Sequence, residues 1–285
     1  MKYIFLIKPK FVSVIEKNPY IDKIHLFSNI SDTINKIKQE QFDFIVDLQN
    51  NRNSRWICWR LGIPNKPFPK LNFQKLLVVW FKVKKLLPRK HIVDRYFEAA
   101  QPLRISNDLK GLDFFINEES VSEKIKNFSA PYVVLVSGGS YYTKKIPYSK
   151  IKEICQHLSS KNIILLGDDK DFEETKNIEK DCPNTINLCG KLNLHESAYL
   201  VKHSEFVITS DTGLMHIAAA FKKKIYSLWG NTIPEFGMYP YMPHPESKII
   251  ENKNLWCRPC SKLGYSHCPL LHFECMKGLD VKNIV

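Results

Sequence analysis

Residues 204–230 constrain the fold of this chain more than any other stretch. Glu205–Thr209 is short, apolar and rich in β-branched side chains, which predicts a buried strand. A polar turn at 210–213 follows, and the small-residue run Leu214–Phe221 predicts a helix. A second apolar run, Ile225–Trp229, predicts another strand. Strand, tight turn and helix in succession are the repeating unit of an α/β fold.

The turn at 210–213 brings free backbone N–H groups to one point. The first N–H groups of a helix have no partner within it and lie at the positive end of its dipole, where anions bind. A plainer alternative is that Ser210 or Asp211 only caps the helix, because both residue types are common caps. His216 has a similar alternative as a half-buried histidine of the first helical turn. The turn alone leaves both interpretations open.

The first half of the chain alternates between predicted strands and helices, a pattern that indicates a parallel sheet with crossover helices. The predicted strands are 3–7, 24–27, 42–48 and an edge strand at 112–116. The predicted helices are 10–16, 31–39 (capped by Ser31 and Asp32), 54–61 and 91–102. The polar segment 117–129 marks a domain boundary.

The alternation restarts after Pro131, with predicted strands at 132–136, 163–166 and 186–188 and helices at 147–158, 172–181 and 195–202. We therefore expect two α/β domains, an N-terminal one at 1–120 and a C-terminal one at 130–285 that ends in a Cys-rich tail, 257–275. Polar turns follow the strands of the second domain at 137–140, 167–169, 190–192 and 211–213. In a doubly wound sheet such turns converge on one crevice.

The charge balance is basic, with a net charge of +13 over 285 residues. A nucleic acid, an anionic membrane surface or an anionic substrate would each suit it. Between Lys66 and His91 there are eight lysines and arginines and no acid, with Trp80 and Phe81 among them. Such a segment is typical of a protein that contacts acidic lipid head groups, or else of an ordinary solvated helix. No run is long enough to span a membrane and no signal peptide is apparent, so we expect a cytoplasmic protein.

Several segments together resemble glycosyltransferase family 9, the ADP-heptose:lipopolysaccharide heptosyltransferases. The most specific match is residues 208–220, with Asp211-Thr212-Gly213, His216 and the following alanines, and then 229–232. Further matches are residues 144–147, 42–48 with 52–55, and 91–96. The resemblance covers nearly the whole chain. It implies a GT-B fold, in which two Rossmann-like domains face a cleft, and an inverting transfer that needs no metal.

The resemblance also implies roles for single residues of the C-terminal domain. Ser140 and Lys144 would hold the donor's phosphates, and Lys144 would neutralise the departing diphosphate. Asp169 and Leu192 would line the nucleoside pocket. The diphosphate and the sugar of the donor would contact four further residues: Asp211, Thr212, Gly213 and His216. Backbone amides suit phosphate oxygens, whereas Asp211 is an anion and should accept hydrogen bonds from sugar hydroxyls.

The chain departs from the family at its beginning. Members start with a strand, a Gly-Asp loop and a helix before the segment that residues 4–27 match, and the Asp of that loop is the expected general base. Without the first strand, a position in the N-terminal sheet is expected to be unfilled, so the N-terminal domain would be incomplete. Asp47, at the end of the predicted strand 42–48, is the nearest acid that could replace it. Position alone does not assign Asp47 this role, so the general base is not identified from the sequence.

The tail contains Cys257 and Cys260 in a C-x-x-C pattern, followed by Cys268 and Cys275. Zinc in a structural site is bound by such thiolates, although free thiols or a redox pair are alternatives. The remaining cysteines are expected to be buried thiols.

We therefore expect a cytoplasmic glycosyltransferase, peripheral at the inner membrane, that uses an ADP-heptose-like donor and a lipid-linked saccharide acceptor of the lipopolysaccharide core. Lys144 and Asp211 are its expected catalytic residues, with no required cofactor and a structural zinc as a candidate metal. The alternatives are an inactive or truncated remnant that binds nucleotide sugars and a basic nucleic-acid-binding protein. Nucleic acid is the least favoured partner because no recognition motif is present.

Overall fold

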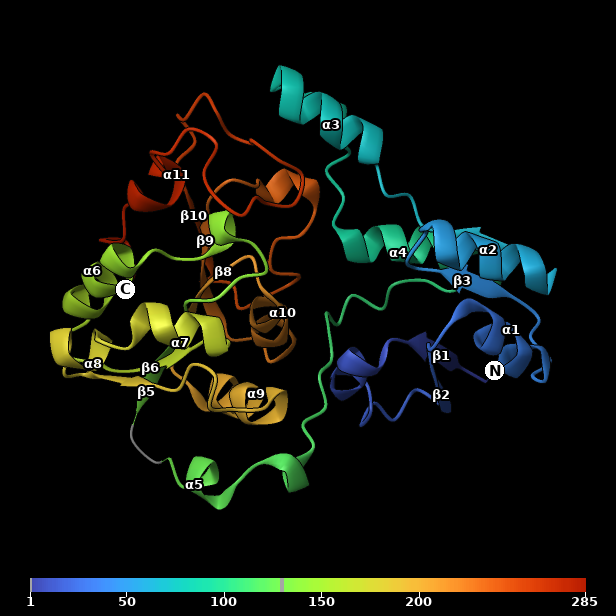
Figure 1. Cartoon of the computed structure of the whole chain (residues 1–285), viewed down its shortest axis with the longest axis horizontal. Coiled ribbons are helices and arrows are strands. Elements are labelled where there is room, and N and C mark those ends of the chain that lie inside the picture. The colour runs from blue at the N-terminus through green and yellow to red at the C-terminus, as the bar shows by residue number, and fades with distance from the viewer. Residues whose placement is uncertain (1, 129–130) are drawn as a thin grey trace. The chain divides into compact units, whose positions relative to one another are not determined.

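The computed structural model describes residues 2–128 and 131–285, which form two compact units (Figure 1). Unit 1 comprises residues 1–71 and 90–110, and unit 2 comprises residues 72–89 and 111–285. The chain thus leaves unit 1 at residue 72, contributes an 18-residue excursion to unit 2, and returns.

Unit 1 contains two separate parallel pairs of strands. β1 (Ile4–Ile7) pairs with β2 (Lys23–Leu26), and β3 (Ile45–Asp47) pairs with β4 (Asn65–Pro67). The helices of this unit are α1 (Ile30–Lys38), α2 (Arg52–Leu61) and α4 (Ile92–Ala100). Short 3-10 turns lie at Pro9–Val14 and Gln101–Leu103.

Unit 2 is built on a six-stranded sheet in which every pair of neighbours is parallel. Its strands are β5 (Tyr132–Val136), β6 (Asn162–Leu166), β7 (Thr185–Asn187), β8 (Phe206–Ser210), β9 (Lys224–Trp229) and β10 (Lys248–Glu251). The helices are α3 (Asn72–Phe81), α5 (Glu123–Lys126), α6 (Tyr148–His157), α7 (Asp169–Thr175), α8 (Ile178–Asp181), α9 (Leu194–His203), α10 (Gly213–Ala220) and α11 (Glu274–Lys277). Short 3-10 turns lie at Lys84–Leu86, Glu118–Ser120, Tyr142–Lys144 and Pro234–Phe236.

The sheet of unit 2 is apolar on both faces, because helices cover each of them (Figure 1). Alternate residues of β5 separate into two cores. Val133 and Leu135 pack with Ile151 and Ile154 of α6, while Val134 and Val136 belong to the core that contains α9 and α10. The five consecutive residues of β5 contain no charged side chain, so neither face of the sheet could be exposed to solvent there, and a helical layer is required on each face.

The strand order β10-β9-β8-β5-β6-β7 reverses direction at β5. From β5 the chain first builds outward through β6 and β7, and then crosses back to place β8 on the other side of β5. At such a reversal the two connecting helices lie on opposite faces, which leaves a crevice at the carboxyl ends of β5 and β8. The predicted α/β class is confirmed, and this unit has the Rossmann-like topology expected of one domain of a GT-B fold.

Several local predictions were wrong for identifiable reasons. The cap of α1 is Asn29, whose side chain accepts a hydrogen bond from the N–H of Asp32. Residues 112–116 form no strand, because Phe114 and Ile116 pack on the core of unit 2 by their side chains alone. The helix predicted at 172–181 is divided into α7 and α8, because the side chain of Asn187 donates to the carbonyl of Thr175 where α7 ends.

The Cys-rich tail is held to the sheet by Arg258, which is buried. Its guanidinium donates to the carbonyls of Gly230, Thr232 and Asn252, and it forms an ion pair with Glu251 at 2.9 Å. Glu251 is also largely buried, so each charge depends on the other. This one side chain connects the end of β9 to the end of β10 and to the start of the tail.

We expect Arg258→Met to lower the free energy of unfolding by about 3–5 kcal/mol, because it leaves the Glu251 carboxylate buried without its cation. Urea unfolding of the purified chain measures the loss. The double substitution Arg258→Met with Glu251→Met removes both charges and should recover most of it. A double variant as unstable as the single one would show that the carbonyl contacts, and not the ion pair, dominate.

Candidate functional site

The crevice at the reversal of the sheet contains an ion pair between residues 67 positions apart. Lys144 lies in the loop after β5 and Asp211 in the turn after β8, and the ammonium of Lys144 is 2.5 Å from the carboxylate of Asp211. Both side chains are mostly buried, with 15% and 10% of their surface exposed. The fold therefore brings together the two residues that the sequence predicts to be catalytic.

His216, on the first turn of α10, belongs to the same group of charges. Burial lowers the pKa of its imidazole below the ordinary value of 6.5, the Asp211 carboxylate opposes that change, and the Lys144 ammonium adds to it. The imidazole is therefore neutral near pH 7 and can both donate and accept a hydrogen bond.

The cap of α10 is Thr212 and not Ser210 or Asp211, the two residues considered from sequence. Its hydroxyl accepts from the N–H of Met215 at 3.3 Å and lies 3.0 Å from the hydroxyl of Thr209. Because Thr212 takes over the capping function, the Asp211 carboxylate is available for Lys144. Gly213, the first residue of α10, is exposed, and the space around its α-carbon is open.

Contacts between the loops bind the carboxyl edge of the sheet into one surface. The hydroxyl of Ser210, at the end of β8, donates to the carbonyl of Gly138 after β5. A side chain at Gly138 would collide with the carboxylate of Asp171 in α7, and one at Gly190 would collide with Asp169. The loops after β5, β6, β7 and β8 therefore touch in sequence, as convergence of the turns requires.

The other predicted site residues lie along the same edge but outside the ion pair. Ser140 is exposed on the loop after β5, Asp169 is exposed beside Gly190, and Leu192 is half-buried after β7. The structure thus brings Lys144, Asp211, Thr212, Gly213 and His216 to the reversal. It leaves Asp169 and Leu192 farther along the edge, after β6 and β7 respectively.

Sequence reasoning missed Arg258 as an organiser of this edge, because the C-x-x-C pattern drew attention only to its thiols. It also missed the closeness of Gly230 to the Lys144 loop, where a β-carbon on Gly230 would lie 2.9 Å from the carbonyl of Thr143. The Trp-Gly-Asn-Thr segment at 229–232 was the available signal.

The four tail cysteines do not form the predicted metal site in the described structure. Within residues 2–128 and 131–285, no group of three or more His, Cys, Asp or Glu side chains has an arrangement that could hold a metal ion. Cys257 has a histidine neighbour, with its sulfur 3.9 Å from Nε2 of His272. Burial raises the pKa of Cys275 to about 12. A structural zinc is therefore not confirmed.

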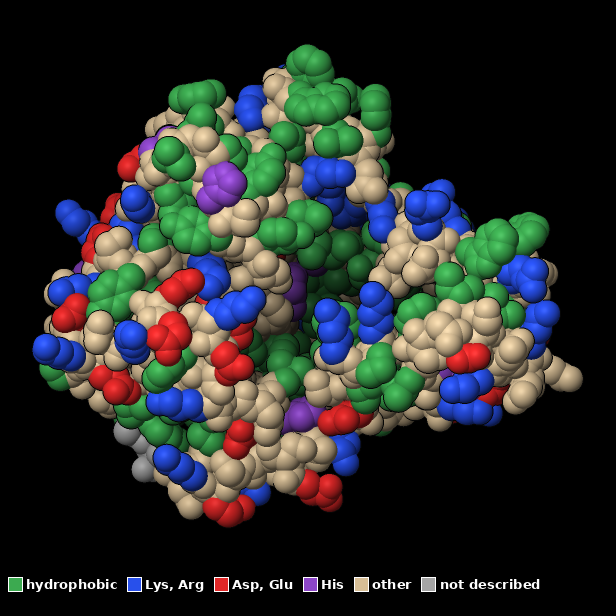
Figure 2. Space-filling view, in the orientation of Figure 1, with side chains coloured by type: hydrophobic (Ala, Val, Ile, Leu, Met, Phe, Trp, Pro, Cys, Tyr) green, Lys and Arg blue, Asp and Glu red, His purple; other side chains and the backbone are tan. Residues whose placement is uncertain are grey.

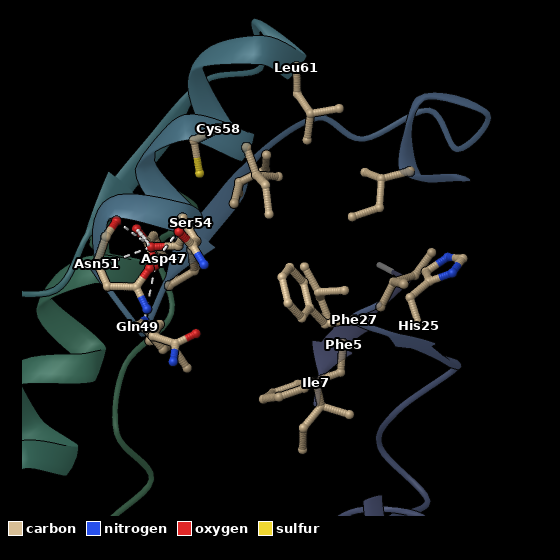
Figure 3. A pocket seen from close by; sticks show the side chains of 18 of the residues that line it. Phe5, Ile7, His25, Phe27, Asp47, Gln49, Asn51, Ser54, Cys58 and Leu61 are labelled. Carbon is tan, nitrogen blue, oxygen red and sulfur yellow. Dashed lines mark hydrogen bonds between the residues drawn. The ribbon is translucent and has the colours of Figure 1, made fainter. Parts of the chain in front are cut away.

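Unit 1 contains a cavity of about 550 Å³ between its two pairs of strands (Figure 3). Residues 4–7 of β1 line one side and residues 45–47 of β3 line the other, with Phe27 and Ile57 among the apolar neighbours. In the described part of the chain, β1 pairs only with β2 and β3 only with β4. The edges of β1 and β3 that adjoin the cavity have no strand partner there.

Asp47, the acid that the sequence offered as a replacement for the general base, lies at the wall of this cavity, and both of its carboxylate oxygens accept hydrogen bonds (Figure 3). One oxygen accepts from the N–H groups of Gln49 and Asn50, and the other accepts from the hydroxyl of Ser54 at 2.8 Å. Asn51 and Ser54 complete a capping box at the start of α2. The carboxylate therefore shapes the turn between β3 and α2, a structural role.

Comparisons with known proteins agree with the geometry. A family model described as glycosyltransferase family 9 (heptosyltransferase) matches residues 30–269. Lipooligosaccharide heptosyltransferase 2 of Haemophilus influenzae is 26% identical over 277 residues, which cover 88% of this chain and 78% of that protein. Lipopolysaccharide heptosyltransferase 2 of Escherichia coli is 24% identical over 222 residues, covering 70% and 63% of the two chains.

Solved structures with the same fold include a glycosyl transferase family 9 protein from Veillonella parvula. It has a TM-score of 0.73 and 19% identity, covering 90% of this chain and 79% of that one. The ADP-heptose lipopolysaccharide heptosyltransferase II of Escherichia coli has a TM-score of 0.66 and 17% identity, covering 98% of both.

The role of Asp47 leads to a prediction of stability. We expect Asp47→Ala to lower the free energy of unfolding by about 2–3 kcal/mol, because two backbone N–H groups and the Ser54 hydroxyl lose a charged acceptor. Chemical unfolding followed by circular dichroism measures it. The matched control is Asp43→Ala, an exposed acid of the same segment, which should change stability by less than about 0.5 kcal/mol. Equal stability of the two variants would contradict the structural role.

The lowered pKa of His216 leads to a prediction of pH dependence. The unfolded chain binds the proton near the ordinary pKa of 6.5, whereas the folded chain binds it only at lower pH. This contribution to stability is complete above pH 6.5 and is lost as the pH falls through the folded-state pKa, with a slope of at most about 1.4 kcal/mol per pH unit. Unfolding of the wild type and of His216→Asn between pH 7.5 and pH 5 measures it. The difference in stability between them should shrink toward acid, and a constant difference would refute the assignment.

Proposed function

Because the chain belongs to glycosyltransferase family 9, as the family model spanning residues 30–269 establishes, we propose that it transfers a heptose or a related sugar from an ADP-sugar donor to the lipopolysaccharide core. Family membership makes the chain a glycosyltransferase with a fold of the GT-B type. The substrates are proposed from the names of its relatives, which are lipooligosaccharide and lipopolysaccharide heptosyltransferases.

The observation that carries the proposal is the Lys144–Asp211 pair at the carboxyl ends of β5 and β8. A parallel sheet of this order binds its ligand at this reversal. The pair supplies a cation for a diphosphate and a carboxylate for hydroxyl groups, which are the two chemistries that a nucleotide sugar presents. A structure of a heptosyltransferase from Escherichia coli with ADP supports the choice of nucleotide.

In the proposed complex, the diphosphate lies at the start of α10, where the N–H groups of Gly213 and Leu214 are the first two of the helix. Lys144 approaches the diphosphate from the loop after β5, and Ser140 of the same loop donates to a phosphate oxygen. Asp211 and the neutral His216 bind hydroxyls of the sugar. Asp169 and Leu192, farther along the edge, line the nucleoside pocket.

The proposed reaction is a direct displacement that inverts the anomeric carbon. A hydroxyl oxygen of the acceptor forms a bond to that carbon while the bond to the diphosphate oxygen breaks, and the electron pair leaves with ADP. Lys144 stabilises the charge that develops on the diphosphate, which is where a positioned cation accelerates the step. The acceptor's proton passes to a base that is not assigned, because the hydrogen bonds of Asp47 give that carboxylate a structural role.

We also propose that the transfer needs no metal, because the Lys144 ammonium takes the position of the divalent cation that many other nucleotide-dependent enzymes use. No part of this proposal uses a metal at the tail cysteines.

We place the reaction at the cytoplasmic face of an anionic membrane, where a lipid-linked saccharide is presented. No helix in the described residues is long and apolar enough to cross a bilayer. Contact with the membrane would then occur at a surface, and the acid-free segment 66–91 is the part of the sequence suited to it.

The donor site is tested by calorimetry with ADP on the wild type and on Lys144→Ala. We expect the variant to bind about 10- to 100-fold more weakly, because a charge-assisted hydrogen bond to the diphosphate is lost. The matched control is Lys161→Ala, which removes a lysine paired with Glu205 at the opposite edge of the same sheet. That variant should bind ADP as the wild type does.

The outcomes separate the candidate functions. Unchanged affinity in Lys144→Ala would refute the phosphate role of this lysine, and no ADP binding by the wild type at millimolar concentration would refute the donor site altogether. Binding of the ADP-sugar without transfer to a core acceptor would favour the inactive, nucleotide-sugar-binding alternative.

A further inference from the structure

Helix α3 packs on unit 2 by one face only. Val78 and Val79 contact a small buried cluster that contains Ile233 and Phe236. Phe73 and Trp80 are seven residues apart, which places them on the same face of the helix, away from Val78. Phe73 is 67% exposed, Trp80 is 64% exposed and Phe81 is 66% exposed. Three aromatic side chains within ten residues thus face solvent.

The Cys-rich tail adjoins this helix, although it lies 175 residues farther along the chain. The ammonium of Lys82, next to the end of α3, donates to the carbonyls of Cys257 and Pro259 at 3.2 and 2.7 Å. Burial at this contact lowers the pKa of Lys82. The tail therefore meets α3 through the ammonium of Lys82, and residues on either side of the contact share one surface.

The tail adds its own exposed apolar side chains to those of α3. Trp256, immediately before the contact with Lys82, is 76% exposed, and Leu271 is 83% exposed. Leu271 precedes His272, which lies 3.9 Å from the sulfur of Cys257, so it belongs to the same neighbourhood. We call Phe73, Trp80, Phe81, Trp256 and Leu271 the aromatic patch. Figure 2 shows apolar side chains gathered over α3, with Lys and Arg side chains beside them.

Both segments that form the aromatic patch lack acids. There is no Asp or Glu between residues 66 and 91, and none between residues 252 and 273. Lys85 and Arg89 are exposed beside α3, and Lys253 is exposed at the start of the tail. Among acids from other elements, Glu235 pairs with Lys84, and Glu251 pairs with Arg258 and lies 4.0 Å from the ammonium of Lys253. The surface therefore combines aromatic side chains with an excess of basic over acidic side chains.

We propose that the aromatic patch inserts into the head-group layer of an anionic lipid bilayer, with Lys85, Arg89 and Lys253 on the lipid phosphates. Trp and Phe prefer the boundary between water and acyl chains, and cations beside them attract acidic lipids, so the two features act together. The inference rests on the proposed function in one respect: a lipid-linked acceptor is the reason for the chain to bind a membrane.

The test is sedimentation of the full chain with unilamellar vesicles, either phosphatidylglycerol with phosphatidylethanolamine or phosphatidylcholine alone. We expect the wild type to bind the anionic vesicles. The double variant Phe73→Ser with Trp80→Ser should bind them at least about tenfold more weakly. Lys85→Glu with Arg89→Glu should also lose binding, and high salt should reduce it. The matched control is Trp56→Ser with Trp59→Ser, an exposed tryptophan pair of α2 in unit 1, which should bind as the wild type does.

Thermal unfolding of each variant checks that the fold is intact, and ADP calorimetry without lipid tests the donor site independently of membrane binding. Equal vesicle binding by the patch variant and the α2 control would overturn the proposal. Absence of binding to anionic vesicles by the wild type would also overturn it, whether or not ADP binds. Concentration-dependent self-association that the patch variant abolishes, without vesicle binding, would assign the surface to a second copy instead.

Discussion

The structure depends on the reversal of strand order between β5 and β8. Because β5 is the first strand of unit 2 and lies in the middle of its sheet, the loops that follow β5 and β8 emerge side by side, on opposite sides of a crevice. Lys144 and Asp211 come from these two loops, and their contact exists only because the sheet places them there. The hydroxyl of Ser210, which donates to the carbonyl of Gly138, holds the two loops together.

Much of this arrangement could be predicted from the sequence, because it depends on periodicity and on local turns. The apolar run 132–136, the turn at 210–213 and the small residues of 214–220 each specify their own element, and parallel strands bring their turns to one edge. The ion pair could not be predicted, because the partner of Lys144 depends on strand order. Thr212 was overlooked as the cap of α10 because Ser210 and Asp211 are equally good caps by residue type.

Tertiary contacts explain the remaining differences. The division between α7 and α8 depends on Asn187, a residue of the neighbouring strand that binds the last carbonyl of α7. Arg258 organises the tail through three carbonyls and Glu251, although its sequence context indicated only thiol chemistry. In unit 1, only residues 45–47 of the predicted strand 42–48 form a strand, because these are the residues that pair with β4. The edge of β3 toward the cavity has no such partner in the described residues.

The ion pair itself limits which ligands the crevice accepts. In the free chain the Lys144 ammonium donates to Asp211, and both groups are mostly buried. An ammonium has three N–H donors, so Lys144 can bind a ligand and still keep Asp211 as a partner. The Asp211 carboxylate repels any anion that enters, and a singly charged anion gains few contacts to offset that repulsion. In the proposed complex, a diphosphate offers several acceptor oxygens and engages Lys144 and the start of α10 together. Sugar hydroxyls next to the diphosphate then donate to the Asp211 carboxylate. The pair therefore suits the proposed ligand, which carries a diphosphate and a sugar in one molecule.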